Sequence, residues 1–331
     1  MITPFIIPFI IAMFLAINMG GSGTAPSFSA AYSSKTLKLA AIPGLFGIMV
    51  FLGAIVGGKE TAKTIGSGLL SSDLMSYWVV SIILFSIAIS LFVANLFGIP
   101  QSTSQSTVLA IIAPAIYYHS FAGDKFFIEI IPTWFVMPII SYVIAYSIGH
   151  LLKRKKRNYK IKNSWMNYII IASSLYVAFS IGANNVANAS GPLFSMAIQE
   201  IHINPSDYNK LLILATLIIA PSFGIGSSIF GKKILKTSTN EIMQVNKVEA
   251  IVISLISASL LLTASLIKGI PTSLVQLSVC AFLGLKVSNS NFKEVFTNTN
   301  VKKFFLMWII APIIAFAVCF VLIMLYDFYL K

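Results

Sequence analysis

Charged side chains are scarce in this chain. Only 10% of its 331 residues are Asp, Glu, Lys or Arg, whereas 57% are hydrophobic; soluble domains carry roughly 25% charged residues. The mean hydropathy of +0.88 points to a protein that uses the lipid bilayer as its solvent. No long polar stretch remains for a soluble catalytic domain, which excludes an enzyme held by a single membrane anchor.

Acidic, histidine and cysteine residues are also few: 10 Asp and Glu, 3 His and 2 Cys. The spacing of His119, His150 and His202 does not bring them onto one face, so we predict no metal site. Cys280 and Cys319 lie in apolar runs, where buried thiols are expected. The chain has no G-x-x-x-x-G-K-[ST] stretch for ATP. No polar segment within its apolar runs offers a catalytic acid, histidine or cysteine, so we predict a protein that is not an enzyme and needs no cofactor.

Positive charge dominates the loops. The net charge is +13, and its densest cluster lies within residues 153–162. The positive-inside rule predicts that this basic loop is cytoplasmic, and no nucleic-acid partner is expected. Loops 231–248 and 286–303 are then also inside, loops 59–75 and 192–210 are outside, and both termini are outside the plasma membrane.

Ten apolar runs predict an all-α polytopic membrane protein. The runs fall near residues 2–19, 39–58, 76–97, 104–119, 133–152, 165–183, 211–230, 249–267, 274–286 and 304–326. A spanning helix needs about 20 apolar residues, so the fourth run of each half is short. Each short run follows a Gly-Ile-Pro turn, and we predict re-entrant helical hairpins at Gly98–Pro100 and Gly269–Pro271.

The two halves of the chain resemble each other. GIPQSTSQ (residues 98–105) matches GIPTSLVQ (269–276), the Gly-Lys and Lys-Thr pairs of residues 58–64 recur at 231–237, and Trp134 and Pro138 recur as Trp308 and Pro312. We predict a first membrane repeat over 1–152, a basic cytoplasmic linker over 153–164 and a second repeat over 165–331. Five crossings per half would place the repeats in opposite orientations, an architecture typical of secondary transporters.

Four polar islands interrupt the apolar runs, at residues 18–29, 101–107, 182–191 and 272–276. They contain Gly, Ser, Thr, Asn and Gln but no charged residue. Polar residues inside a membrane are costly and mark functional sites, although small residues also serve close helix packing. Glycine can end a helix, and Pro100 and Pro271 suit the first turn of one. Two helix N-termini brought together would form a cradle for an anion.

The polar islands also carry a family resemblance. GANNVANA (residues 182–189) resembles the G-x-N-D-x-A-N-A signature of the inorganic phosphate transporter (PiT) family, and the two GIP segments resemble its G-x-P-V-S-T-T-H motif. The signature Asp is Asn185 here, and the motif His is Gln105 in one half and Gln276 in the other. Ser22, Gly23 and Pro26 replace the Asn, Asp and Asn of the first signature, as in the sulfate permease branch.

The resemblance implies a helical carrier for a tetrahedral oxyanion, driven by sodium or protons, and it implies candidate site residues. The substrate candidates are Ser22, Gly23, Thr24, Ser102, Thr103, Ser104, Asn184, Asn185, Asn188, Thr272 and Ser273. The cation-coupling candidates are Asn18, Asn184, Asn188, Gln105, Gln276 and Glu249. The bilayer and a second copy in a homodimer are the other partners we expect.

The missing signature carboxylates favour sulfate. Hydrogen phosphate can donate a hydrogen bond to a carboxylate, whereas sulfate only accepts, so a carboxylate beside sulfate adds repulsion. We therefore expect import of sulfate by cation symport and alternating access. Phosphate symport is the alternative, and a passive anion channel with the same islands is a third.

The coupling ion is the least constrained expectation. Asn carbonyl groups can bind sodium, but without formal charge the site would be weaker than one with the family Asp. Proton coupling needs a titratable group, and Glu60, Asp73 and Glu249 near span ends are the candidates. We expect uptake to depend on the proton gradient and not on sodium.

Overall fold

The computed structural model describes residues 3–97, 101–121, 123–154, 163–201, 207–237, 245–290, 292–297 and 299–330. Within these ranges the regular structure is helical and no strand occurs. The helices are α1 (Thr3–Ser33), η1 (Leu39–Ala41), α2 (Ile42–Gly57), α3 (Lys59–Ser67), η2 (Ser72–Leu74), α4 (Tyr77–Phe97), α5 (Thr103–Tyr117), α6 (Gly123–Lys125), η3 (Phe126–Ile130), α7 (Ile131–Arg154), α8 (Asn163–Asn185), α9 (Ala187–Ile201), α10 (Tyr208–Ile219), α11 (Pro221–Thr237), α12 (Lys247–Thr263), η6 (Ala264–Lys268), α13 (Leu274–Asn289), α14 (Phe292–Thr297) and α15 (Thr299–Leu330).

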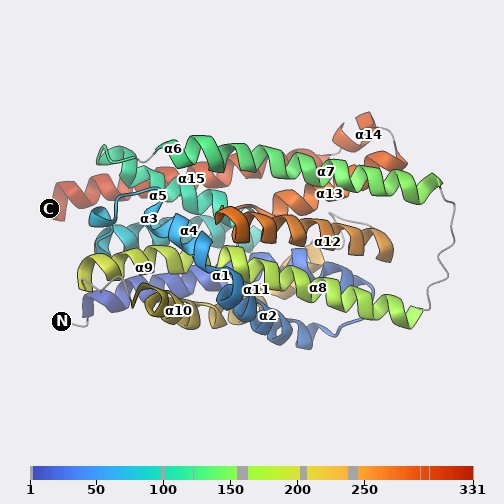
Figure 1. The fold of residues 1–331 in the computed structure, drawn as a ribbon, viewed down its shortest axis with the longest axis horizontal. Coiled ribbons are helices and arrows are strands. Elements are labelled where there is room, and N and C mark those ends of the chain that lie inside the picture. Colours follow the sequence, from blue (N-terminus) through green and yellow to red (C-terminus); the bar gives the residue numbers. More distant parts are fainter. Residues whose placement is uncertain are drawn as a thin grey trace.

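The helices form an elongated bundle that confirms the predicted all-α membrane fold (Figure 1). Within the described ranges, eight helical segments are long and apolar enough to cross a membrane. Their outer faces carry exposed large apolar residues such as Ile10 (60% exposed) and Ile48 (60%). Such faces suit contact with lipid chains. The two short predicted runs become α5 and α13, of 15 and 16 residues.

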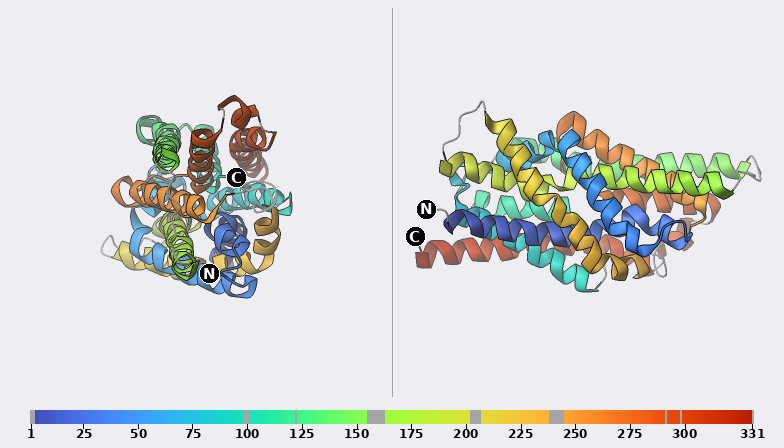
Figure 2. Two further views of the ribbon diagram at one scale, coloured as in Figure 1. Left: turned by 90° about the vertical axis from the view of Figure 1, so that its right-hand side faces the viewer. Right: turned by 90° about the horizontal axis from the view of Figure 1, so that it is seen from below.

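The two chain termini lie at the same end of the bundle. The end of α7 and the start of α8 both lie at the opposite end of the bundle (Figures 1 and 2). This placement agrees with termini on one side of a membrane and a linker on the other; which side is cytoplasmic stays a prediction. Residues 155–162 of the basic linker and the predicted turn Gly98–Pro100 lie outside the described residues.

α12 and α13 form a helical hairpin whose tip is buried. η6, a π-helical turn, carries α12 on to Gly269, where a φ of 60° ends the helix. The side chains of Thr272 and Ser273 in the turn are 1% and 3% exposed. This confirms the second predicted hairpin. One detail of the prediction is wrong: Pro271 lies in the turn and not in the first helical turn, because Ser273 takes the N-cap position and α13 begins at Leu274.

The first polar island does not end a helix, contrary to what its glycines suggested. Residues 18–29 lie inside the uninterrupted helix α1. The hydroxyls of Ser22 and Thr24 donate to the carbonyls of Met19 and Gly20 in the preceding turn, so the helix satisfies its own polar side chains. The matching island of the second half is broken, since α8 ends and α9 begins within it.

Parts of the predicted loops are helical. Residues 59–75 contain α3, and residues 192–210 contain much of α9. The two helices pack against each other, and Ala62 of α3 shares an apolar cluster with Ala187 and Phe194 of α9. Packing of one amphipathic face stabilises a short helix that would be marginal alone.

The helix contacts fall into matching pairs across the two halves. α1, the first helix of the first half, packs against α11 and α4, and α8, the first helix of the second half, packs against α2 and α12. In the same way α7 packs against α13, and α15 packs against α5. Two of these crossings need glycine: a Cβ on Gly182 would lie 2.0 Å from the carbonyl oxygen of Val50, and one on Gly226 would lie 1.8 Å from that of Ile17. The packing of each half therefore has a counterpart in the other.

Gly269→Ala is expected to destabilise the protein. The left-handed backbone disfavours any side chain there, and a Cβ would lie 2.5 Å from the carbonyl oxygen of Glu60 in α3. We expect the melting temperature in detergent to fall by several degrees, for a cost of about 1–3 kcal/mol. Gly44→Ala is the matched control, since no atom lies within 4 Å of the position that its new methyl group would take, and it should melt as the native protein does. Equal melting of the two variants would contradict the role of Gly269.

Candidate functional site

The four polar islands meet at one small pocket between α1, α8 and the N-termini of α5 and α13, called the central pocket below. Its volume is about 10 Å³, which is room for about one water molecule. The lining residues are Ser22, Gly23, Pro26, Gln101, Thr103, Ile181, Asn185, Ser273, Leu274 and Val275. None of these side chains is charged. The polar groups they offer are hydroxyls and carboxamides, which are the donor types that bind anions.

Two helix N-termini flank this pocket with the same capping geometry. The hydroxyl oxygen of Ser102 accepts a hydrogen bond from the backbone N–H of Gln105, and that of Ser273 accepts from Gln276, each at 3.3 Å. A capping hydroxyl still carries one O–H that it can donate. The first-turn N–H groups of α5 and α13 have no partner inside their own helices. The predicted pair of helix starts is therefore present, with serine at each N-cap.

Asn184, at the end of α8, holds the tip of the α12–α13 hairpin. Its Nδ2 donates to Ser265 Oγ (2.7 Å) and to the carbonyl oxygen of Ile270 (3.1 Å). Its Oδ1 accepts from the backbone N–H of Thr272 (3.2 Å) and from the hydroxyl of Ser104 (3.3 Å). Asn184 is completely buried. Its carboxamide bonds groups of the α12–α13 hairpin and of α5, so it links the hairpin tip to the start of α5.

Asn185 and Asn188 bond to the first turn of α5. Asn185 Nδ2 donates to Thr103 Oγ1 at 3.1 Å, and Asn188 Nδ2 donates to Ser104 Oγ at 3.4 Å. Both side chains are buried. Their Oδ1 atoms have no hydrogen-bond partner within the described part of the chain. These carbonyl oxygens are available to a donor or a cation.

A reciprocal pair of glutamines lies beside the two N-termini. Gln105 Nε2 donates to Gln276 Oε1 (3.2 Å), and Gln276 Nε2 donates to Gln105 Oε1 (2.9 Å). The pair lines a separate, mostly apolar cavity of about 690 Å³ between α7 and α15, together with Trp134 and its counterpart Trp308. Each of these two predicted cation-coupling residues therefore provides a hydrogen-bond donor and acceptor for the side-chain amide of the other.

Two predicted site residues of α1, Asn18 and Thr24, form hydrogen bonds with neighbouring helices. Asn18 Nδ2 donates to the carbonyl oxygen of Phe14, and Asn95 of α4 donates to the backbone and side-chain oxygens of Asn18. Thr24 donates to Ser227 of α11 at 2.8 Å. Neither Asn18 nor Thr24 lines the central pocket, whereas Ser22 and Gly23 do.

The three predicted acidic candidates lie outside the pocket. Glu249 belongs to a capping box with Asn246 at the start of α12, and Asp73 accepts a hydrogen bond from Ser71. Glu60 forms an exposed ion pair with Lys63 at 3.2 Å.

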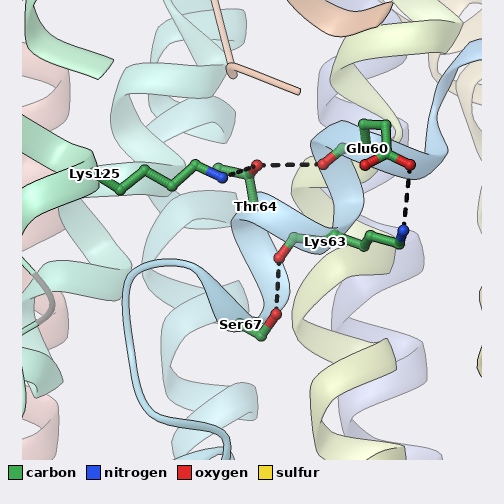
Figure 3. A network of polar contacts seen from close by, with 5 residues as sticks. All are labelled: Glu60, Lys63, Thr64, Ser67 and Lys125. Atoms are coloured by element: carbon green, nitrogen blue, oxygen red, sulfur yellow. Dashed lines mark hydrogen bonds and ion pairs between the residues drawn. The ribbon is translucent and has the colours of Figure 1, made fainter. Parts of the chain in front are cut away.

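The backbone carbonyl of Glu60 faces Gly269 at the hairpin tip. That carbonyl also accepts from Thr64, whose hydroxyl in turn accepts from Lys125 Nζ at 2.9 Å (Figure 3). The network ties α3 to the end of α6.

Three residues of this region were missed by sequence reasoning. Ser265 bonds Asn184 but sits in an apolar run. Trp134, which suits an interfacial anchor, instead donates its indole Nε1–H to the carbonyl oxygen of Pro271 at 2.9 Å. Gln101 lines the pocket. It belongs to the first hairpin motif, and its position directly before Ser102 is the sequence feature that could have identified it as a site residue.

Comparisons with known proteins agree on one family. The model of the phosphate transporter family matches residues 19–319. The chain is 30% identical over 324 residues to the sulfate permease CysP of Bacillus subtilis (strain 168), covering 96% of this chain and 88% of that protein. It is 27% identical to a probable low-affinity inorganic phosphate transporter of the same organism, covering 88% and 87%. A solved structure titled the sodium-dependent phosphate transporter superposes with a TM-score of 0.84 at 18% identity, covering 99% of this chain and 100% of that one.

Asn184→Ala is expected to loosen the hairpin tip. The substitution leaves the backbone groups of Ile270 and Thr272 without their buried partner, which costs about 1–3 kcal/mol for each group left unsatisfied. Thermal unfolding in detergent should show a melting temperature several degrees below that of Asn289→Ala, a control whose side chain bonds only its own helix. If both variants melt alike, Asn184 does not hold the tip.

Proposed function

Because this chain belongs to the phosphate transporter family, we propose that it is a secondary active transporter that imports sulfate by cation symport. The family and the fold establish a multi-pass membrane transporter. The substrate, the coupling and the residue roles below are our proposal.

The single observation that carries the sulfate proposal is the chemistry of the central pocket. Its polar lining consists of Ser22, Gln101, Thr103, Asn185 and Ser273. All are neutral, and all except Ser22, whose hydroxyl donates within α1, can donate to an anion. Sulfate is fully ionised and needs only donors, so this set serves it without repulsion from a carboxylate. The similarity to a sulfate permease at 30% identity supports the same substrate.

Phosphate is the second candidate, favoured by a specific observation. The Oδ1 atoms of Asn185 and Asn188 are buried and lack partners within the described residues. The proton of hydrogen phosphate could donate to such an oxygen. A probable phosphate transporter is also among the similar proteins.

The matched helix contacts support two repeats of inverted topology, over 1–152 and 165–331 with the basic linker between them. Repeats of this kind give two conformations of similar energy that open to opposite sides. A pocket of about 10 Å³ is too small for a tetrahedral oxyanion, so transport requires the hairpin tips to separate from α1 and α8. The termini would face the outside and the basic linker the cytoplasm.

Proteoliposomes containing the purified chain test the substrate directly. We expect radiolabelled sulfate to accumulate above its external concentration when a cation gradient is imposed, with phosphate competing at least about tenfold more weakly, a difference of about 1.4 kcal/mol. Accumulation of phosphate in preference to sulfate would overturn the substrate assignment and leave the transporter class intact. Uptake that only equilibrates would indicate a passive channel.

Asn185→Asp is expected to shift selectivity from sulfate towards phosphate. The new carboxylate would repel a fully ionised anion and accept a hydrogen bond from a protonated one. We expect the sulfate KM to rise about tenfold or more and the phosphate KM to fall. Asn289→Asp makes the same change of charge outside the pocket and should alter neither value. An unchanged ratio in Asn185→Asp would remove this residue from substrate selection.

A second uptake measurement tests which cation is coupled to transport. Titratable groups are absent from the pocket lining, and Glu60 is the acidic residue whose backbone faces the hairpin tip. We expect a protonophore to abolish concentrative sulfate uptake, replacement of sodium by choline to leave it intact, and Glu60→Gln to retain only equilibrating exchange. Loss of uptake without sodium would instead assign the ion to carbonyl oxygens such as those of Asn185 and Asn188.

A further inference from the structure

Gln101 is buried in the central pocket with no hydrogen-bond partner for either end of its side chain. Its exposed fraction is 1%. Among the described residues neither Oε1 nor Nε2 has a partner. The residue directly precedes the N-cap of α5 and lines the pocket with Ser22, Thr103 and Asn185.

This arrangement costs stability. A buried amide that bonds nothing loses its interactions with water and gains none in return. The neighbouring polar side chains of the pocket do not share this state: Ser22, Thr103, Asn185 and Ser273 each make at least one hydrogen bond. Gln101 is therefore the lining residue whose whole carboxamide is left for something that enters the pocket.

We propose that Gln101 binds the transported oxyanion directly and sets its selectivity, an inference that rests on the oxyanion transport proposed above. Its Nε2 offers two N–H donors to a sulfate oxygen, in the same pocket as the capping hydroxyl of Ser273 and the amide of Asn185. Widening of the pocket brings the anion to this amide, so the bond forms only when substrate is bound. The substrate thereby satisfies the donor end of a group that the empty protein leaves unsatisfied.

Gln101→Leu separates this role from a structural one. A residue needed for folding would lower the melting temperature when replaced. An unsatisfied amide replaced by an apolar side chain of similar size should leave the melting temperature of the substrate-free protein equal or higher. At the same time the dissociation constant for sulfate, measured by isothermal titration, should rise on the order of 10- to 100-fold.

Ser174→Ala is the matched control. Ser174 of α8 is also buried with an Oγ that lacks a partner in the described part of the chain, but it does not line the pocket. We expect its melting temperature to behave like that of Gln101→Leu and its affinity for sulfate to stay native. Loss of sulfate affinity in Ser174→Ala as well would overturn the assignment, since the effect would not depend on the pocket.

Gln101→Glu removes the donors and adds a negative charge, because the carboxylate keeps the shape of the amide but only accepts. We expect sulfate binding to weaken further than in Gln101→Leu, and hydrogen phosphate, which can donate, to be affected less. Native sulfate affinity in both Gln101 variants would overturn this proposal while the transport function stood. A native protein that binds neither sulfate nor phosphate would overturn the proposed function itself. If it binds only phosphate and Gln101→Leu loses that affinity, the contact is confirmed and the sulfate assignment fails.

Discussion

A backbone that turns back inside a bilayer leaves N–H and C=O groups that no lipid can bond. In this protein the carboxamide of Asn184 meets that requirement for the α12–α13 hairpin, by accepting from Thr272 and donating to Ile270. The same carboxamide accepts from Ser104, so it fixes one helix N-terminus relative to the other. This buried side chain thus links the two segments that bring Thr103 and Ser273 to the wall of the central pocket.

The two halves match in their larger helix contacts but differ in the chemistry of the central pocket. Helix contacts come in matching pairs, and the two serine N-caps have equal geometry. The signature segments differ: α1 runs unbroken and bonds its own hydroxyls, whereas the break between α8 and α9 presents three asparagines to the hairpins. Both halves contribute to the polar lining of the pocket, but with different groups: Ser22, Gln101 and Thr103 come from the first half, Asn185 and Ser273 from the second.

Apolar runs, repeated motifs and polar islands were enough to predict the helical membrane fold, the second hairpin and the pair of helix N-termini. That residues of all four islands share one site was implied by the family resemblance. Features decided by tertiary contact were not predictable. The glycines of α1 serve close packing, as a Cβ on Gly20 would lie 2.2 Å from the carbonyl oxygen of Phe223, so their capacity to end a helix is not used. Trp134 reaches Pro271 across 137 positions of sequence, and composition shows no trace of such a pairing.

The reciprocal bond between Gln105 and Gln276 joins equivalent positions of the two halves. If the two halves exchange conformations, each residue takes the environment that its equivalent in the other half had before. A contact between equivalent residues is then the same before and after the exchange, whereas a contact such as that of Thr24 with Ser227 is not. The glutamine pair can then persist through the whole cycle at constant energy. It would act as a pivot, a fixed point about which the hairpins rock while the bonds on either side are exchanged.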